Sequence, residues 1–272
     1  MKNQKLNANI YKYLLGFVVI TVSAFVQSSN ALAKSSQKGL EIATEVKQRD
    51  MGWQDTNANM QMILRGPTGD ESVREIRVAT LEVEGDGDKS LTIFDLPKDV
   101  AGTAFLSFSK TDGADDQWIY LPALKRVKRI STRNKSSPFM GSEFAYEDMT
   151  SFELEKFSFA YLRDEKYNDL DCFVVEQVPT DKYSGYTKQI VWVDKAHYRM
   201  QRTEFYDRKG ALLKVLEPSE YELHLDKFWR AHQLDMVNVQ SDKSTTLIID
   251  DIQFKTGLTD KYFTKNALQR LR

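Results

Sequence analysis

Residues 118–130 read Trp-Ile-Tyr-Leu-Pro-Ala-Leu-Lys-Arg-Val-Lys-Arg-Ile, an aromatic segment that turns at a proline and returns as a basic one. Neighbouring side chains of a β-strand point to opposite faces, so Trp118 and Tyr120 would share one face. We therefore predict a β-hairpin in which residues 117–121 pair with residues 124–131.

The returning strand of this hairpin is strongly basic. Arg126 and Lys128 would lie on one of its faces and Arg129 on the other. Two interpretations fit this pattern. The strand is either an ordinary solvated surface or a cationic rim that contacts anionic headgroups or an acidic partner.

The same alternation recurs along most of the chain, beginning with Met60, Met62 and Leu64 on one face of a strand that follows Asp55. Turn residues separate the alternating segments, as they do at residues 66–70. Many short strands at near-regular spacing favour a meandering antiparallel sheet. The further strands that we predict cover residues 74–81, 90–96, 103–110, 171–178, 187–194, 199–206, 212–216, 221–225, 234–239 and 245–254.

Two segments break the alternation. Residues 37–51 have a helical period, with Leu40, Ala43 and Met51 among the apolar residues near one face. The aromatic residues of segment 139–162 are irregularly spaced. We predict one helix in the first segment and short helices or a long loop in the second.

The N-terminus has the three parts of a secretory signal. Three lysines lie within the first twelve residues, and an uncharged apolar run follows at residues 13–26. This run is too short to cross a bilayer comfortably. Ala31 and Ala33 place small side chains at the −3 and −1 positions of a cleavage site. We expect cleavage after Ala33 and a single folded domain over residues 34–272.

The composition limits the function. Removal of residues 1–33 takes away three of the 38 Lys and Arg residues and none of the 39 Asp and Glu residues. The remaining 239 residues therefore hold 35 basic and 39 acidic side chains, a formal charge of −4, which gives no reason to expect nucleic-acid binding. Cys172 is the only cysteine, so we expect neither disulfides nor a lipid anchor at the cleavage site. We expect a freely diffusing monomer.

The spacing of reactive residues suggests no catalytic or metal centre. His197, His224 and His232 lack the HExxH spacing of zinc sites, and no nucleophile motif is present. Cys172 opens a predicted strand, where a small buried residue is its usual role. Acidic turns offer at most a weak calcium site. We therefore expect no enzyme, no metal and no cofactor.

A second informative segment, residues 137–149, reads Ser-Pro-Phe-Met-Gly-Ser-Glu-Phe-Ala-Tyr-Glu-Asp-Met. Large apolar residues on an irregular segment either plug a core or line a cavity. The residues leave both roles open. The five residues concerned are Phe139, Met140, Phe144, Tyr146 and Met149.

These two segments resemble the outer-membrane lipoprotein-sorting protein family, of LolA-like type. The run from Trp192 to Lys214 resembles the same family, and the likeness extends from about Gly39 to the C-terminus. The resemblance implies an unclosed antiparallel β-barrel whose mouth is covered by helices and whose concave face holds acyl chains. It also implies a periplasmic carrier with a large inner-membrane exporter of the RND type as its partner.

Our leading hypothesis is a periplasmic carrier that shields lipid or lipoprotein acyl chains between the curved sheet and the helical lid. The well-known carriers are shorter and lack the Tyr-Leu-Pro and Met-Gly-Ser pieces, so phospholipid, hopanoid or polyene cargo is equally open. A cargo-free adaptor of an RND-type exporter is the alternative. Arg126, Lys128 and Arg129 would contact headgroups or the partner. The residues expected to line the acyl-chain cavity are Met60, Met62, Leu64, Trp118, Tyr120, Phe139, Met140, Phe144, Tyr146 and Met149.

Overall fold

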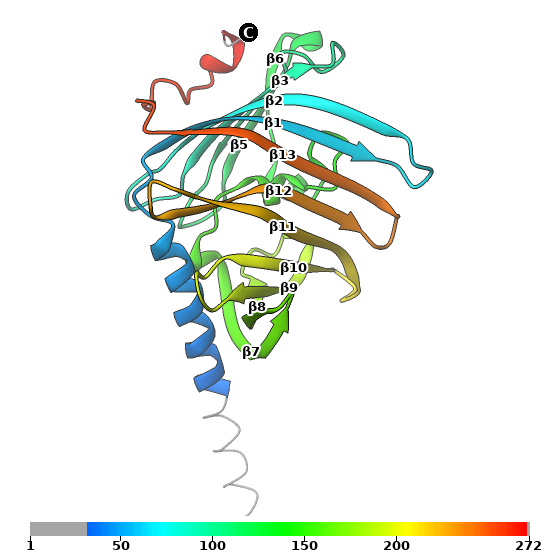
Figure 1. The fold of residues 1–272 in the computed structure, drawn as a ribbon. Coiled ribbons are helices and arrows are strands. Elements are labelled where there is room, and N and C mark those ends of the chain that lie inside the picture. The colour runs from blue at the N-terminus through cyan, green and yellow to red at the C-terminus, as the bar shows by residue number, and fades with distance from the viewer. Residues whose placement is uncertain (1–31, 271–272) are drawn as a thin grey trace, which may run out of the picture.

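A computed structural model of the chain describes residues 32–270. The predicted signal segment, apart from its last two residues, lies outside this range. The described chain forms one antiparallel sheet of thirteen strands and one helix, residues 32–49 (Figure 1). The strands are β1 (Asp55–Arg65), β2 (Glu71–Leu81), β3 (Lys89–Leu96), β4 (Ala104–Phe108), β5 (Asp116–Leu121), β6 (Arg126–Arg129), β7 (Phe157–Tyr167), β8 (Leu170–Pro179), β9 (Tyr186–Asp194), β10 (Met200–Asp207), β11 (Leu212–His224), β12 (Phe228–Asn238) and β13 (Lys243–Phe254).

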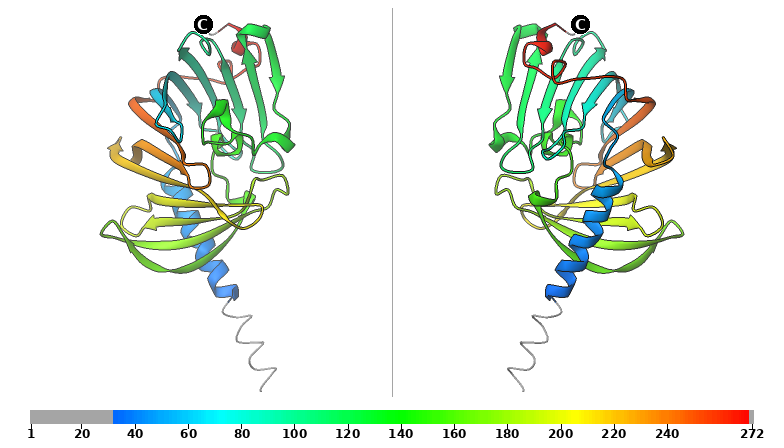
Figure 2. Two further views of the ribbon diagram at one scale, coloured as in Figure 1. Left: turned by 90° about the vertical axis from the view of Figure 1, so that its right-hand side faces the viewer. Right: turned by 90° about the vertical axis from the view of Figure 1, so that its left-hand side faces the viewer.

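The sheet consists of two meanders joined in the middle. Strands β1 to β6 pair in sequence order, strands β7 to β13 do the same, and β1 pairs with β13. Within the described chain β6 and β7 form the two ends of the sheet and are not paired with each other. The sheet is strongly curved (Figure 2). The predicted class, an unclosed antiparallel barrel with a helical cover, is confirmed.

The connection between β6 and β7 contains the irregular segment. It holds four 3₁₀ turns, three of which follow residue 138: Phe139–Gly141, Tyr146–Met149 and Leu154–Lys156. The predicted short helices are thus present as 3₁₀ turns. The prediction that irregular structure continues to residue 162 is wrong, because β7 already begins at Phe157. Phe157 and Phe159 face the same side and pack with Phe152, so the aromatic cluster conceals a strand.

Two predicted strands, 212–216 and 221–225, form the single strand β11. Pro218 lies inside it, opposite Leu234. The residues between the two predicted strands, Glu217, Pro218, Ser219 and Glu220, thus belong to the same strand. A left-handed backbone φ of 52° at Glu220 lies within this strand without ending it.

The packed face of the helix matches the predicted one only in part, because Ala43 lies on it as predicted but Leu40 does not, and Met51 lies beyond the end of the helix. Ile42 and Ala43 are buried, whereas Leu40 and Met51 are each 46% exposed. Gly39 sets this orientation, because a Cβ atom there would lie 2.8 Å from the backbone carbonyl carbon of Ala160 in β7. The missing side chain lets the helix approach the sheet closely.

Two apolar layers cover the two faces of the first meander. On the inner face, Met62, Phe94 and Phe105 belong to one buried cluster with residues of the β6–β7 connection. On the outer face, Leu91 and Leu106 pack against the chain that follows β13, and the residues of that segment at the contact are Leu258, Tyr262, Phe263 and Leu268.

Candidate functional site

A cavity of about 650 Å³ lies on the inner face of the second meander, beneath the helix and the β6–β7 connection. Its size falls within the range of about 300–1,000 Å³ that is usual for small-molecule sites. The helix contributes Ile42, Ala43 and Val46 to its wall. The sheet and the connection supply most of the remaining apolar lining: Phe144, Phe152, Phe157, Val175, Val191, Val193, Phe205, Leu216, Leu234 and Met236.

Strand alternation explains why this wall is apolar. Val191 and Val193 are alternate residues of β9 and lie on the cavity side, where they pack with Ile42 and Ala43. Ile190 and Trp192 form a separate cluster with Cys172 and its neighbours. Both faces of β9 are therefore apolar, but only one of them borders an open volume.

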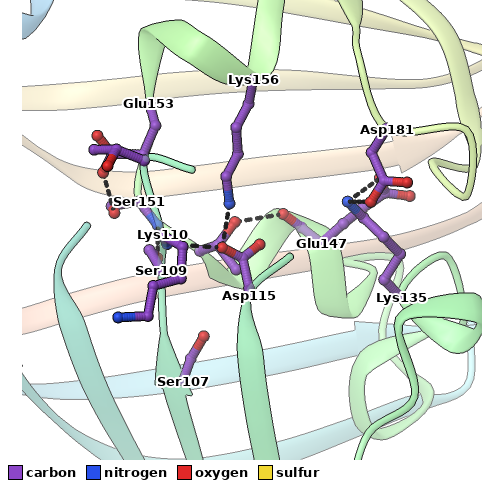
Figure 3. Close-up of polar contacts among 12 residues, drawn as sticks. Ser107, Ser109, Lys110, Asp115, Lys135, Glu147, Ser151, Glu153, Lys156 and Asp181 are labelled. Atoms are coloured by element: carbon purple, nitrogen blue, oxygen red, sulfur yellow. Dashed lines mark hydrogen bonds and ion pairs between the residues drawn. The ribbon is translucent and has the colours of Figure 1, made fainter. Parts of the chain in front are cut away.

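Charged side chains surround the same cavity. Lys156 pairs with Asp115, and Lys135 lies 3.0 Å from Asp181 and 4.0 Å from Glu147, measured between the amine nitrogen and the carboxylate oxygens. Figure 3 shows the two lysines facing these acids. An apolar interior bordered by charged groups of both signs suits an amphipathic molecule whose tail is buried and whose head is polar.

The Tyr-Glu-Asp-Met motif anchors the β6–β7 connection to the sheet. Asp148 accepts hydrogen bonds from the Lys214 amine at 2.6 Å, the Tyr186 hydroxyl at 2.9 Å and the Ala145 backbone N–H at 2.7 Å. The side chains of Lys214 and Asp148 are only 4% and 9% exposed. Burial, together with the nearby Asp148 carboxylate, raises the pKa of Tyr186 well above its usual value, so Tyr186 remains a hydrogen-bond donor.

Glu147 ties the same motif to the turn that precedes β9. Its two carboxylate oxygens accept hydrogen bonds from the Gly185 N–H and the Ser184 hydroxyl, both at 2.8 Å. Burial raises the pKa of Glu147, and these two donors oppose the rise. The motif therefore fixes one wall of the cavity through polar contacts, a role that the sequence did not reveal.

The structure brings eight of the ten predicted lining residues together, but mostly beside the cavity rather than around it. Met62, Phe139 and Phe144 are buried members of the inner cluster, and of the predicted set Phe144 alone borders the cavity. The other five are partly buried and pack against the same cluster: Met60, Leu64, Met140, Tyr146 and Met149.

Phe139 plugs the core and does not line the cavity, which decides between the two roles that the sequence left open. Its side chain is 0% exposed, and its ring centroid lies 5.0 Å from that of Phe105 and 5.9 Å from that of Phe94. It fills the concave face of the first meander. The β6–β7 connection therefore plugs the concave face of the first meander, and through Phe144 it also forms part of the cavity wall over the second meander.

Trp118 and Tyr120 were predicted on the cavity side, and the structure places them elsewhere. Trp118 pairs with Leu106 and packs with the C-terminal segment, whereas the neighbouring pair, Phe105 and Ile119, faces inward. Trp118 and Tyr120 share one face of β5 as predicted, but this is the outer face of the sheet and not the cavity side. The sequence does not reveal that the C-terminal segment covers the outer face.

The basic hairpin strand forms one end of the sheet. Arg126, Lys128 and Arg129 are exposed, and Arg129 pairs with Asp116. None of the three lines the cavity, although Thr132 and Lys135, a few residues later, do. The hairpin is therefore adjacent to the connection that forms the cavity wall.

Other reactive groups match a structural role. Cys172 is fully buried, and burial raises its thiol pKa to about 11, so it is a poor nucleophile. The turn acids are paired with the protein's own cations: Asp86 lies 2.6 Å from the Lys110 amine, and Asp115 contacts Lys156. Among residues 32–270, no helix is both long enough and apolar enough to span a membrane.

The fold and the cavity define a class, the half-barrel proteins with a helix across the concave face. A LolA superfamily protein from Nitrosomonas europaea has this fold, with a TM-score of 0.68 and 22% identity over 86% of this chain and 99% of that one. A DUF1329 family protein from Desulfovibrio piger is 29% identical, with a TM-score of 0.82 over 86% and 99% of the two chains.

A third solved structure is much more similar in sequence. An outer membrane lipoprotein-sorting protein domain from Vibrio parahaemolyticus is 63% identical, with a TM-score of 0.85, and the match covers 86% of this chain and all of that one. The chain belongs to this lipoprotein-sorting family, as its sequence motifs predicted. A family model described only as an uncharacterized protein matches residues 86–270. The search of curated proteins gave no match.

Proposed function

We propose that the protein is a periplasmic carrier that holds the acyl chains of a lipid or lipoprotein in the cavity beneath its helix. The observation that carries the proposal is the open apolar volume of about 650 Å³ between the helix and strands β8 to β12. Each buried methylene contributes about 0.8 kcal/mol, so such a volume can hold an acyl chain away from water. Membership of the lipoprotein-sorting family supports the same assignment.

The charged residues beside the cavity would contact the polar head of the cargo. Lys135 and Lys156 suit a phosphate or carboxylate, and each is paired with an acid of the protein itself. A headgroup would therefore compete with Asp181 and Asp115 for these lysines. An anionic lipid should then bind more tightly at low ionic strength, because salt screens the attraction between an approaching headgroup and the two lysines.

Native lipid content tests the proposal. The protein is expressed with its export segment, purified without detergent from the periplasmic fraction and extracted with organic solvent for mass spectrometry. We expect one lipid per chain, displaceable by a fluorescent fatty acid. Repeated extracts without lipid, together with no binding of the fluorescent fatty acid, would contradict a carrier function.

An exporter adaptor is the second candidate, and the exposed basic strand at the end of the sheet favours it. Such a protein would dock to an RND-type partner in the inner membrane through Arg126, Lys128 and Arg129. Replacement of these three residues with Glu should weaken that contact at low salt. If the triple variant leaves partner binding unchanged while lipid is present in the cavity, the adaptor role is excluded and the carrier role stands.

A further inference from the structure

Three potential metal ligands meet on the β11–β12 hairpin, away from the lining of the cavity. The Nε2 atoms of His224 and His232 are 3.2 Å apart, and a carboxylate oxygen of Glu222 lies 3.5 Å from Nε2 of His232. The three ligand atoms all lie within 4.8 Å of one another. Among residues 32–270, no other group of three or more His, Cys, Asp or Glu side chains meets in this way.

The spacing matches that of ligands around a single metal ion. Zinc binds imidazole nitrogen at about 2.0–2.1 Å in a tetrahedral arrangement, which places two ligand atoms about 3.3 Å apart. The distances of 3.2 Å and 3.5 Å fall on either side of this value. Two histidines and one glutamate form a common three-ligand zinc set that leaves the fourth position open.

The orientation of His232 is also the one that a metal ligand needs. Its Nδ1 lies 2.8 Å from the backbone carbonyl oxygen of Ile249. A carbonyl only accepts, so Nδ1 carries the proton and Nε2 of the neutral ring presents a lone pair to His224. A backbone carbonyl behind the ligating histidine is the usual outer contact in metal sites.

His224 is held in a surrounding that favours its neutral form. Its ring lies 5.2 Å from that of Phe254, between centroids, and stacks on His232 at 5.5 Å. Burial lowers the pKa of His224, and the neighbouring His232 lowers it further. Without a metal, the proton on Nε2 of His224 would bridge the two rings. Metal binding through Nε2 would require the other neutral tautomer of His224, in which Nε2 gives up its proton and Nδ1 carries one.

The geometry of the β11–β12 hairpin explains why the spacing of these residues along the sequence does not indicate a metal site. β11 and β12 keep a constant register from Ser219–Gln233 to His224–Phe228, except that Glu220 and His232 do not pair. The left-handed φ of 52° at Glu220 coincides with this gap. The two histidines are eight residues apart and come together only because the hairpin folds between them.

We propose that Glu222, His224 and His232 bind one divalent transition-metal ion, with zinc as the best fit, on the hairpin beside the C-terminal end of the helix. Lys227 and Arg230 of the same hairpin contact the backbone carbonyl of Met51 and the Asp50 side chain. A bound ion would therefore stabilise the part of the sheet on which the helix ends. This inference does not depend on the carrier function.

Titration of the metal-free protein with Zn²⁺ tests the site. The protein is prepared without a polyhistidine tag and freed of metal with a chelator before calorimetry. We expect one Zn²⁺ per chain and a higher melting temperature when Zn²⁺ is added, because the ion binds the folded state. Glu222→Gln should weaken binding by about 10-fold or more, and His232→Ala should do the same.

His197→Ala is the matched control, because it removes the one histidine outside the group. It should bind Zn²⁺ as the unaltered protein does. Co²⁺ spectra of the His224→Ala variant give an independent reading of ligand loss, and circular dichroism checks that each variant is folded. The proposal is overturned if the unaltered protein binds no Zn²⁺, or if His232→Ala and His224→Ala remain folded and bind Zn²⁺ as tightly as the unaltered protein does.

Discussion

The two halves of the concave face have the same strand architecture but different contents. Over the first meander, Phe139 from the β6–β7 connection fills the space between Phe94 and Phe105. Over the second meander the helix stands across the sheet and leaves a cavity of about 650 Å³. The concave face of the sheet is apolar in both halves, so both halves can hold an apolar occupant. The protein's own chain supplies that occupant on one side, and we propose that a lipid supplies it on the other.

Removal of the plug should have the largest effect on stability. We expect Phe139→Ala to lower the free energy of unfolding by about 4 kcal/mol, because a fully buried phenyl group is lost and a cavity remains. Urea denaturation measures this loss. Leu124→Ala, at a residue that is 50% exposed, is the control and should change the stability by less than about 0.5 kcal/mol. Equal effects for the two variants would contradict the conclusion that Phe139 fills the concave face of the first meander.

Loss of the buried ion pair between Lys214 and Asp148, which anchors the β6–β7 connection, should have the next largest effect on stability. Lys214→Met leaves the Asp148 carboxylate buried without its cation, and such a change costs about 3–5 kcal/mol. We expect the lower end, about 3 kcal/mol, because Tyr186 and Ala145 still donate hydrogen bonds to Asp148. Combining it with Asp148→Leu should recover part of the loss in the same denaturation assay. A double variant less stable than Lys214→Met would show that the charge is not the cause.

A smaller, pH-dependent effect should appear where the connection passes from plug to cavity wall. The backbone N–H of Asp88 donates to the Ser151 hydroxyl of the connection at 3.2 Å, and burial raises the pKa of the Asp88 carboxyl to about 6. The folded state therefore binds this proton more tightly than the unfolded state, whose pKa is near 3.8. The resulting stability is present below pH 4 and is lost as the pH rises through 6.

Asp88→Asn removes this titration. We expect the variant to be more stable than the unaltered protein by about 2 kcal/mol at pH 8 and nearly equal to it below pH 4. Thermal melts across this pH range measure the difference. A stability gain that is independent of pH would mean that another contact of Asp88 is responsible.

The sheet was largely predictable from sequence, because alternation is a local signal that each strand carries by itself. Strand β7 was missed because Phe152, Phe157 and Phe159 form one aromatic cluster across a turn and a strand. The pairing of β1 with β13 has no local signal. It depends on two segments nearly 200 residues apart, such as Thr56 and Phe254, which are direct partners.

The candidate site was predictable only in part, because alternation is a local signal and the site depends on contacts between distant segments. Alternation correctly placed Met60, Met62 and Leu64 on one face of their strand, but they lie beside the cavity and do not border it. Alternation could not tell the inner from the outer face for Trp118, since the C-terminal segment that covers Trp118 is distant in sequence. The cavity residues of β9 were missed because both faces of that strand are apolar. The histidine pair was missed because spacing along the chain does not report proximity across a hairpin.

The binding of a fluorescent fatty acid to cavity-filled variants tests the central claim most directly. Leu216→Trp places a larger side chain in the cavity, whereas Val237→Trp places the same side chain at a 44% exposed position of the neighbouring strand. We predict that the first variant loses affinity by about 10-fold or more, equivalent to about 1.4 kcal/mol, and that the second binds as the unaltered protein does. Equal affinity of both folded variants would contradict the claim that this cavity holds the cargo.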